Sequence, residues 1–309
     1  MKILGIGNAI VDVICRVNEE FIYQNNLIKG NMKLIFDEKE FTTLMTNLKI
    51  EKTISGGSVA NSIVGLSQLG NEVGFIGKVC NDKLGEEYEN GLKKENVHYI
   101  YNKKKEILPT GTCLILITPD SERTMCTYLG IAGKINEDDI NLESIKQSEI
   151  IFLEGYLWDE GDPKKAFDKA IKNARKVAMS LSDKFCVDRH KPHFLDLVKN
   201  KLDIVFANEE EIMSLINAKN FKEVIEFSKE SKKLLVITRG EKGAISIKEN
   251  NIIETGIKKN LKIIDLTGAG DLFAAGYLHG VINNLTAKES LIKGTELSSK
   301  IIQKIGARI

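Results

Sequence analysis

Cysteine is scarce in this chain of 309 residues, and its arrangement excludes two kinds of structural framework. The five copies are Cys15, Cys80, Cys113, Cys126 and Cys186. No two stand at Cys-x-x-Cys spacing, which argues against a structural zinc site, and an odd number does not suit a disulfide framework. We therefore expect reduced thiols and a cytoplasmic protein.

Excess charge and long apolar runs are also missing. The net charge of +1 creates no field that would attract nucleic acid or a membrane surface. No apolar run reaches the ~20 residues that span a bilayer, and Asp12 interrupts the apolar opening segment, unlike a signal peptide. With only four prolines, no Pro/Gly/Ser-rich linker divides the chain. We expect neither nucleic acid nor membrane as a partner.

Short apolar runs that alternate with amphipathic stretches fill most of the sequence. The runs that indicate buried strands are 2–7, 73–76, 150–153, 177–181, 203–206 and 234–238. The stretches that indicate helices are 58–69, 82–94, 163–177 and 285–309. This alternation predicts an α/β fold with a doubly wound, mainly parallel sheet flanked by helices.

Two regions break the alternation. Residues 13–54 and 107–130 contain β-type segments, such as 112–118, without a regular crossover helix. We predict that they form a small β-rich lid. Residues 1–12, 55–106 and 131–309 then form the main α/β domain.

The segment 263–273 is the most informative for chemistry. An apolar run enters a turn at Gly268 and Gly270 and continues into an apolar helix. Glycine lets the backbone approach a ligand closely, and the unpaired N–H groups of a helix start suit phosphate oxygens. Asp271 could accept a proton there, or it could simply cap the helix. The residues alone leave both readings open.

Five segments together resemble the PfkB/ribokinase family of carbohydrate and nucleoside kinases. Asp-x-Thr-Gly-Ala-Gly-Asp at 265–271 is similar to the C-terminal signature of that family, and segments 5–12, 56–61, 208–211 and 238–243 match its other motifs in the same order. Leu266 departs from the family, which often has Thr there. The resemblance implies a ribokinase-like fold and an ATP-dependent phosphotransferase.

The resemblance also implies roles for single residues. Asp271 would be the catalytic base, with an anion hole at Gly268, Ala269 and Gly270, and Arg123 would reach the transferred phosphate. ATP would be bound by Asn208, Thr238, Gly240 and Gly243. Glu211 would hold Mg²⁺ through water, as suits a cation that dehydrates reluctantly. A monovalent cation near Asp265 is a further family feature.

The acceptor would be bound by the remaining motif residues. These are Asn8, Asp12, Gly56, Gly57, Asn61 and Thr267, and Asp12 could accept bonds from two sugar hydroxyls. Segment 109–113, segment 181–185 and the opening strand resemble the adenosine-kinase-like members, which implies base contacts by Cys113, Leu129, Tyr156 and Phe185. Adenosine is therefore the expected acceptor, in a monomer or homodimer.

Several alternatives remain. A fructokinase-like or ketodeoxygluconate-kinase-like enzyme would share the same motifs, and a non-catalytic nucleoside or sugar sensor could share the fold. A dinucleotide-binding dehydrogenase is disfavoured because Ile10 stands where the third glycine would be. His190 and His193 could suggest a metal pair, but Pro192 disfavours a helix there, and a surface loop is expected.

Overall fold

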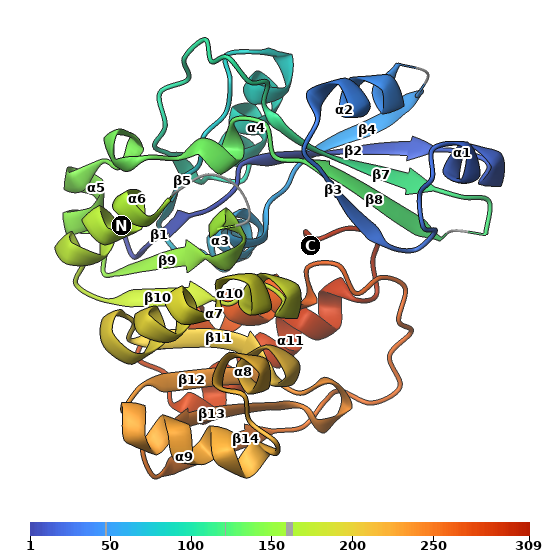
Figure 1. The fold of residues 1–309 in the computed structure, drawn as a ribbon. Helices are drawn as coiled ribbons and strands as arrows, with labels where there is room; N and C mark the ends of the chain where they lie inside the picture. Colours follow the sequence, from blue (N-terminus) through green and yellow to red (C-terminus); the bar gives the residue numbers. More distant parts are fainter. Residues whose placement is uncertain (47, 121, 159–162) are drawn as a thin grey trace.

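The computed structural model describes residues 1–46, 48–120, 122–158 and 163–309, which form two sheets (Figure 1). The larger sheet has, in spatial order, β14 (Asn251–Thr255), β13 (Ala244–Lys248), β12 (Leu234–Thr238), β11 (Ile204–Asn208), β10 (Val177–Ser180), β9 (Ile150–Glu154), β1 (Ile3–Ile6), β5 (Val73–Ile76) and β6 (His98–Tyr99). Neighbouring strands from β6 to β12 are parallel. Strand β13 is antiparallel to both of its neighbours, β12 and β14.

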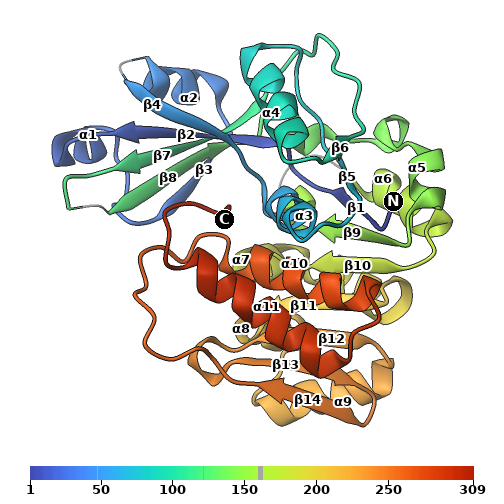
Figure 2. The same ribbon diagram turned by 180° about the vertical axis from the view of Figure 1, so that it is seen from behind.

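Helices cover both faces of this sheet, as the sequence predicts. One face carries α3 (Ser58–Gln68), α10 (Ala269–Ile282) and α11 (Ala287–Ile301), seen in front of the sheet in Figure 2. The other carries α5 (Leu142–Gln147), α6 (Lys164–Asn173), α7 (Lys184–Asp196), α8 (Glu209–Ile216) and α9 (Phe221–Ser231). The predicted doubly wound α/β fold is confirmed.

Alternate residues of the central strands pack into two separate cores. In β1, Ile3 belongs to the core beneath α3 and α10, whereas Leu4 and Ile6 belong to the core beneath α7 and α8. Side chains of a strand point alternately to its two faces, so a strand covered on both sides must be apolar throughout. This explains why the sequence shows uninterrupted apolar runs here.

The smaller sheet projects beyond the large one and lies next to its crevice (Figure 1). Its order is β3 (Met32–Ile35), β8 (Arg123–Tyr128), β7 (Gly111–Ile117), β2 (Ile10–Arg16) and β4 (Ile50–Ser55), with α1 (Glu19–Gln24) and α2 (Glu38–Met45) inserted between its strands. Because β2 starts at Ile10, Asp12 lies within this sheet. The division of the chain into domain and lid remains a prediction.

Helix starts follow the capping residues. The Asp82 carboxylate caps α4 (Lys83–Lys94) by accepting a bond from the Gly85 N–H at 2.8 Å. Shorter turns complete the described chain: η1 (Ala132–Lys134), η2 (Glu137–Asp139), η3 (Gly155–Trp158), η4 (Leu197–Lys201) and η5 (Gly240–Lys242). No helix in the described ranges is long and apolar enough to cross a membrane. All five cysteines are buried thiols.

Three expectations about helices were wrong. Residues 190–193 are part of α7 rather than a loop, because a kink at His190 (φ −116°, ψ 15°) makes room for the ring of Pro192. Helix α6 ends at Asn173, before the predicted 177. Helix α11 ends at Ile301, and residues 302–309 turn back toward the crevice.

Candidate active site

Two strands whose connections leave in opposite directions define the crevice. After β1 the chain passes through β2, β3 and β4 of the smaller sheet and then α3 to reach β5 on one side of β1. On the other side, β9 leads through α6 to β10. Ligands of open α/β sheets bind at such a switch point, outside the carboxyl ends of the strands. The side chains there already interact, since the Asn8 amide donates to Glu154 Oε1 at 3.1 Å.

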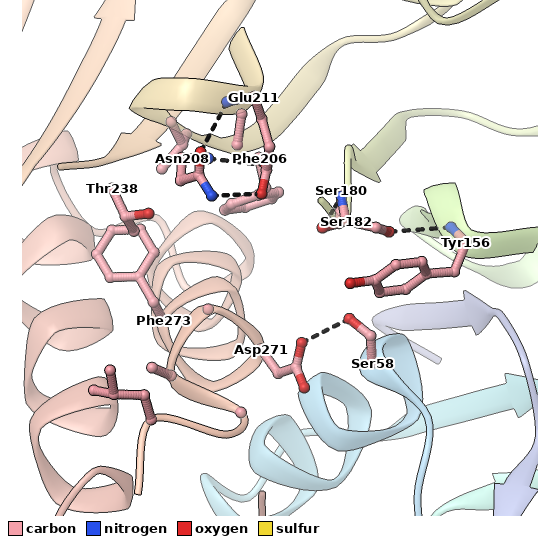
Figure 3. Close-up of a pocket in the computed structure, with 16 residues that line it drawn as sticks. Ser58, Tyr156, Ser180, Ser182, Phe206, Asn208, Glu211, Thr238, Asp271 and Phe273 are labelled. Atoms are coloured by element: carbon pink, nitrogen blue, oxygen red, sulfur yellow. Dashed lines mark hydrogen bonds between the residues drawn. The ribbon is translucent and has the colours of Figure 1, made fainter. Parts of the chain in front are cut away.

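Asp271 stands at the start of α10, above this crevice. Ser58 Oγ donates to its Oδ1 at 2.6 Å (Figure 3). Asn61 Nδ2 donates to its Oδ2 at 3.0 Å. Burial raises the pKa of Asp271 to about 6, while the bonds from Ser58 and Asn61 and the charge of Arg308 act to lower it. The carboxylate is therefore oriented, and is ionised above about pH 6.

The turn before Asp271 requires glycine. Gly268 is the N-cap of α10 with φ of +77°, and a Cβ there would lie 2.7 Å from Ala307 Cα. The N-terminus of this 14-residue helix, at Ala269 and Gly270, lines a cavity of about 410 Å³. The Ala269 N–H already donates to the Leu266 carbonyl at 3.1 Å. The helix dipole and the following N–H groups of the first turn make this place favourable for phosphate.

Asn208 and Glu211 face the same cavity from the β11–α8 junction (Figure 3). Asn208 is the N-cap of α8, and its amide donates to Glu211 Oε1 at 2.6 Å. Unlike an ordinary first-turn glutamate, Glu211 is only 5% exposed, and burial raises its pKa to about 7. No cluster of three or more acidic, His or Cys side chains that could enclose a metal occurs among the described residues. One or two carboxylates plus water suit Mg²⁺.

A second, more apolar cavity of about 740 Å³ adjoins the glycine turn. Thr238, Gly240 and Gly243, the residues expected to bind the nucleotide, are among those that line it. Its walls are largely apolar side chains, among them Ile257, Leu261, Ile263, Leu266, Phe273 and Ile302. The flat aromatic base of a nucleotide would suit these apolar walls. The phosphates of that nucleotide would then lie toward Gly270, which lines both cavities.

A third cavity, of about 610 Å³, lies between the smaller sheet, α4 and the segment after α11, with Asn61 of α3 at its side. Asp12, Asn61, Arg123 and Thr267 line it, so four of the predicted residues are brought together. Burial raises the pKa of Asp12 to about 7, with Arg308 acting to lower it and Asp271 to raise it. Asn61 of this cavity donates to Asp271 of the phosphate cavity at 3.0 Å, so one hydrogen bond links the two cavities.

The Gly-Gly motif, formed by Gly56 and Gly57 of the segment 56–61, packs against Asp12 and Asn8. Gly57 precedes α3 with φ of +99°, and a Cβ there would collide with the Asn8 carbonyl oxygen. Gly56 is buried against Asp12, since a Cβ there would lie 2.7 Å from Asp12 Oδ2. Close approach of β4, β2 and α3 therefore depends on these two glycines.

Some predicted residues lie elsewhere. Phe185 is 71% exposed, because Asp183 starts α7 and turns this side chain outward. Cys113 and Leu129 are buried and line none of the three cavities. Tyr156 lines the phosphate cavity rather than the third cavity.

Arg123 lines the third cavity but is already paired. Its Nη1 contacts Asp265 Oδ2 at 2.5 Å, and Thr267 donates to the other oxygen of Asp265. The monovalent cation near Asp265 remains a prediction.

Sequence reasoning missed three residues. Ser58 directly follows the Gly-Gly motif, and Glu154 is a charge at the end of an apolar run, so both gave a signal. Burial raises the pKa of Glu154 to about 7, against the bond from the Val59 N–H. Arg308 gave no such signal, because it lies in the segment 285–309 that the sequence predicts to be a helix with basic residues at its end.

This arrangement defines a ribokinase-like kinase fold, and comparison gives the family. The chain matches the pattern of the pfkB family carbohydrate kinases over residues 28–309 and belongs to that family. Such kinases use ATP, typically with Mg²⁺. The predicted family is confirmed.

Individual relatives are named for different acceptors. Adenosine kinase from Sinorhizobium meliloti is 34% identical, with a TM-score of 0.90 over 100% of this chain and 95% of that chain. Adenosine kinase 2 of Arabidopsis thaliana is 23% identical, covering 98% of this chain and 94% of the relative. A 5-dehydro-2-deoxygluconokinase of Halalkalibacterium halodurans is 25% identical over 84% of each.

Proposed function

We propose that this kinase transfers the γ-phosphate of ATP to a primary hydroxyl, and that its acceptor is the 5′-OH of adenosine. The observation that carries the proposal is the hydrogen bond from Asn61, which lines the third cavity, to Asp271, which lines the phosphate cavity. Phosphate-binding groups lie on one side, and the carboxylate of Asp12 lies on the other. The similarity to the Sinorhizobium meliloti adenosine kinase over the whole chain supports the nucleoside acceptor.

In the proposed reaction, Asp271 takes the proton of the acceptor hydroxyl. The oxygen then bonds to the γ-phosphorus, the bond to the β-phosphate bridging oxygen breaks, and ADP leaves. Ser58 and Asn61 hold the carboxylate in place at 2.6 and 3.0 Å. The Gly270 N–H and the positive end of the α10 dipole stabilise the charge that gathers on the phosphoryl oxygens.

The other side chains bind and orient the two substrates. Asp12 binds sugar hydroxyls, while Thr238 and the turn at Gly240 and Gly243 bind the nucleotide. Asn208 and Glu211 would hold Mg²⁺ through water, and the ion would neutralise phosphate charge when bound. The smaller sheet would close over the acceptor and exclude water, which limits hydrolysis of ATP.

A sugar acid is the second candidate acceptor. Two arginines, Arg123 and Arg308, line the third cavity, and a guanidinium suits a carboxylate. The relative named 5-dehydro-2-deoxygluconokinase is 25% identical over 84% of this chain. Pairing of Arg123 with Asp265 weighs against this candidate.

The test is coupled ADP release with Mg-ATP across adenosine, ribose, fructose and 5-dehydro-2-deoxygluconate. Turnover with adenosine alone supports the proposal. Turnover with the sugar acid and none with adenosine replaces it by the second candidate. Absence of acceptor-dependent ADP release with all four compounds contradicts both candidate acceptors.

A further inference from the structure

The segment that follows α11, residues 302–309, is fixed against the active site. The Gly306 N–H donates to Asp265 Oδ2 at 2.8 Å, and Ala307 packs on the glycine turn, where a Cβ at Gly268 would come within 2.7 Å of its Cα. Gln68 of α3 donates to the Ile309 carbonyl at 3.3 Å. Both figures place this segment between the smaller sheet and α10 (Figures 1 and 2). The position of residue 308 is therefore set from both sides.

The Arg308 side chain enters the third cavity and is incompletely bonded there. Its Nε donates to Asn61 Oδ1 at 3.1 Å. Its Nη2 is buried and has no hydrogen-bond partner among the described residues. A guanidinium offers five donors, and leaving buried donors unpaired is costly. In an acceptor site, such a donor points to an oxygen that arrives with the ligand.

The charge of Arg308 acts on the carboxylates of the site. Asp12, Asp271 and Glu95 face it, with the Tyr88 hydroxyl beside them. Its positive charge lowers the pKa of both Asp12 and Asp271, against the effect of burial. The Asp271 charge in turn raises the pKa of the buried Glu154 carboxyl. Arg123, the other arginine that lines this cavity, forms an ion pair with Asp265 rather than with Asp12 or Asp271.

We propose that Arg308 is an acceptor-binding residue, which donates from Nη2 to an oxygen of the acceptor while Nε holds Asn61 beside the catalytic carboxylate. The inference rests on the proposed function, since it takes the third cavity as the acceptor site. It adds a residue from outside the motifs, supplied by a segment that also packs on the anion-binding turn.

The variants for the test are Arg308→Gln and Arg308→Lys in the full chain. Lys304→Gln is the matched control, because Lys304 is an exposed cation of the same segment that does not line the cavity. Each is assayed with Mg-ATP and whichever compound of the acceptor panel the wild type phosphorylates. Thermal melting from pH 5 to pH 8 is recorded in parallel and needs no acceptor.

For Arg308→Gln we expect the KM for the acceptor to rise about tenfold or more, as for loss of a charged hydrogen bond, with the KM for ATP unchanged. The acid limb of kcat/KM for the acceptor moves to higher pH. Arg308→Lys keeps the charge and leaves that limb in place, but its acceptor KM is still raised. The melting temperature of Arg308→Gln should fall more steeply with rising pH than that of the wild type. The reason is that, without the arginine charge, the pKa values of Asp12 and Asp271 in the folded state rise further above those in the unfolded chain.

Two results overturn the inference. Wild-type values of the acceptor KM and of the acid limb in Arg308→Gln would show that Arg308 does not serve the acceptor. An equal rise in both KM values would show general damage to the segment. A wild type that phosphorylates no compound contradicts the proposed function instead, and the pH dependence of melting then still decides whether Arg308 acts on the carboxylates.

Discussion

Single side chains divide the site into a donor half and an acceptor half. Asp271 belongs to both, because it lines the phosphate cavity and is bonded by Asn61 of the third cavity. Asp12 belongs to the acceptor half, and Glu211 to the donor half. Replacing either of the last two should therefore affect one substrate and spare the other.

Asp12→Asn tests this division. A carboxylate accepts stronger hydrogen bonds than an amide, so the KM for the acceptor should rise about tenfold to a hundredfold, with little change in the KM for ATP. Steady-state kinetics with each substrate varied in turn measures both constants. Glu211→Gln is the reciprocal control, since it should raise the Mg²⁺ requirement and leave the acceptor KM in place. A weakened ATP affinity in Asp12→Asn would contradict the assignment of Asp12 to the acceptor.

At the scale of elements, the glycine turn before α10 joins catalysis to the segment after α11. Gly268 has φ of +77° and packs on Ala307, whereas nothing lies within 4 Å of a Cβ added at Gly270. The two glycines are two residues apart in one turn, so they form a matched pair.

Gly268→Ala should destabilise the protein, and Gly270→Ala should not. The first places a side chain in left-handed backbone and against Ala307, at a cost of about 1–3 kcal/mol. The second places a methyl group in open space within a helix, where alanine is favoured. Denaturant unfolding of both variants measures the difference. Equal stability of the pair would contradict the described packing of Ala307 on this turn.

Most elements could be predicted because a local pattern specifies them. Strands 73–76 and 234–238 coincide with β5 and β12, and the start of α4 follows from Asp82. The segment 302–309 could not, since the amphipathic Lys-rich pattern of α11 continues past Ile301. What turns it back is a set of contacts with residues distant in sequence, namely Asp265, Gly268 and Asn61.

The site divides in the same way. Gly268, Asp271 and the Asn208–Glu211 pair carry a local signature, a turn or a cap, and the structure brings them together. The apolar contacts expected for the base depend on which way a side chain turns. Phe185 illustrates this, because its exposure is decided by where α7 begins.

At the scale of the whole molecule, several acidic side chains are buried at the junction of the two sheets. Burial raises the pKa of Asp12, Glu154 and Glu211 to about 7 each, above the values near 4 of an unfolded chain. A group with a raised pKa in the folded state stabilises it fully at low pH and loses that contribution as pH rises through the folded pKa. The unfolding free energy should therefore fall between pH 5 and pH 8.

Glu154→Gln should reduce this fall by on the order of 2 kcal/mol. The amide cannot ionise, and it can keep both bonds, because Asn8 Oδ1 has no partner among the described residues and a rotated Asn8 amide could accept from it. Melting or denaturant unfolding across this pH range measures the slope, with Glu249→Gln as an exposed control. A slope equal to wild type would contradict the buried, ionisable state of Glu154.

The proposal that Asp271 is the general base between the two cavities is tested most directly by the turnover of Asp271→Asn with Mg-ATP and the preferred acceptor. The amide keeps the size of the side chain but cannot take the proton. We predict a loss of kcat by a factor of about 10² to 10⁴, with ATP still raising the melting temperature as it does in the wild type. Near-normal turnover would contradict the role of Asp271 as the base and with it the proposed reaction.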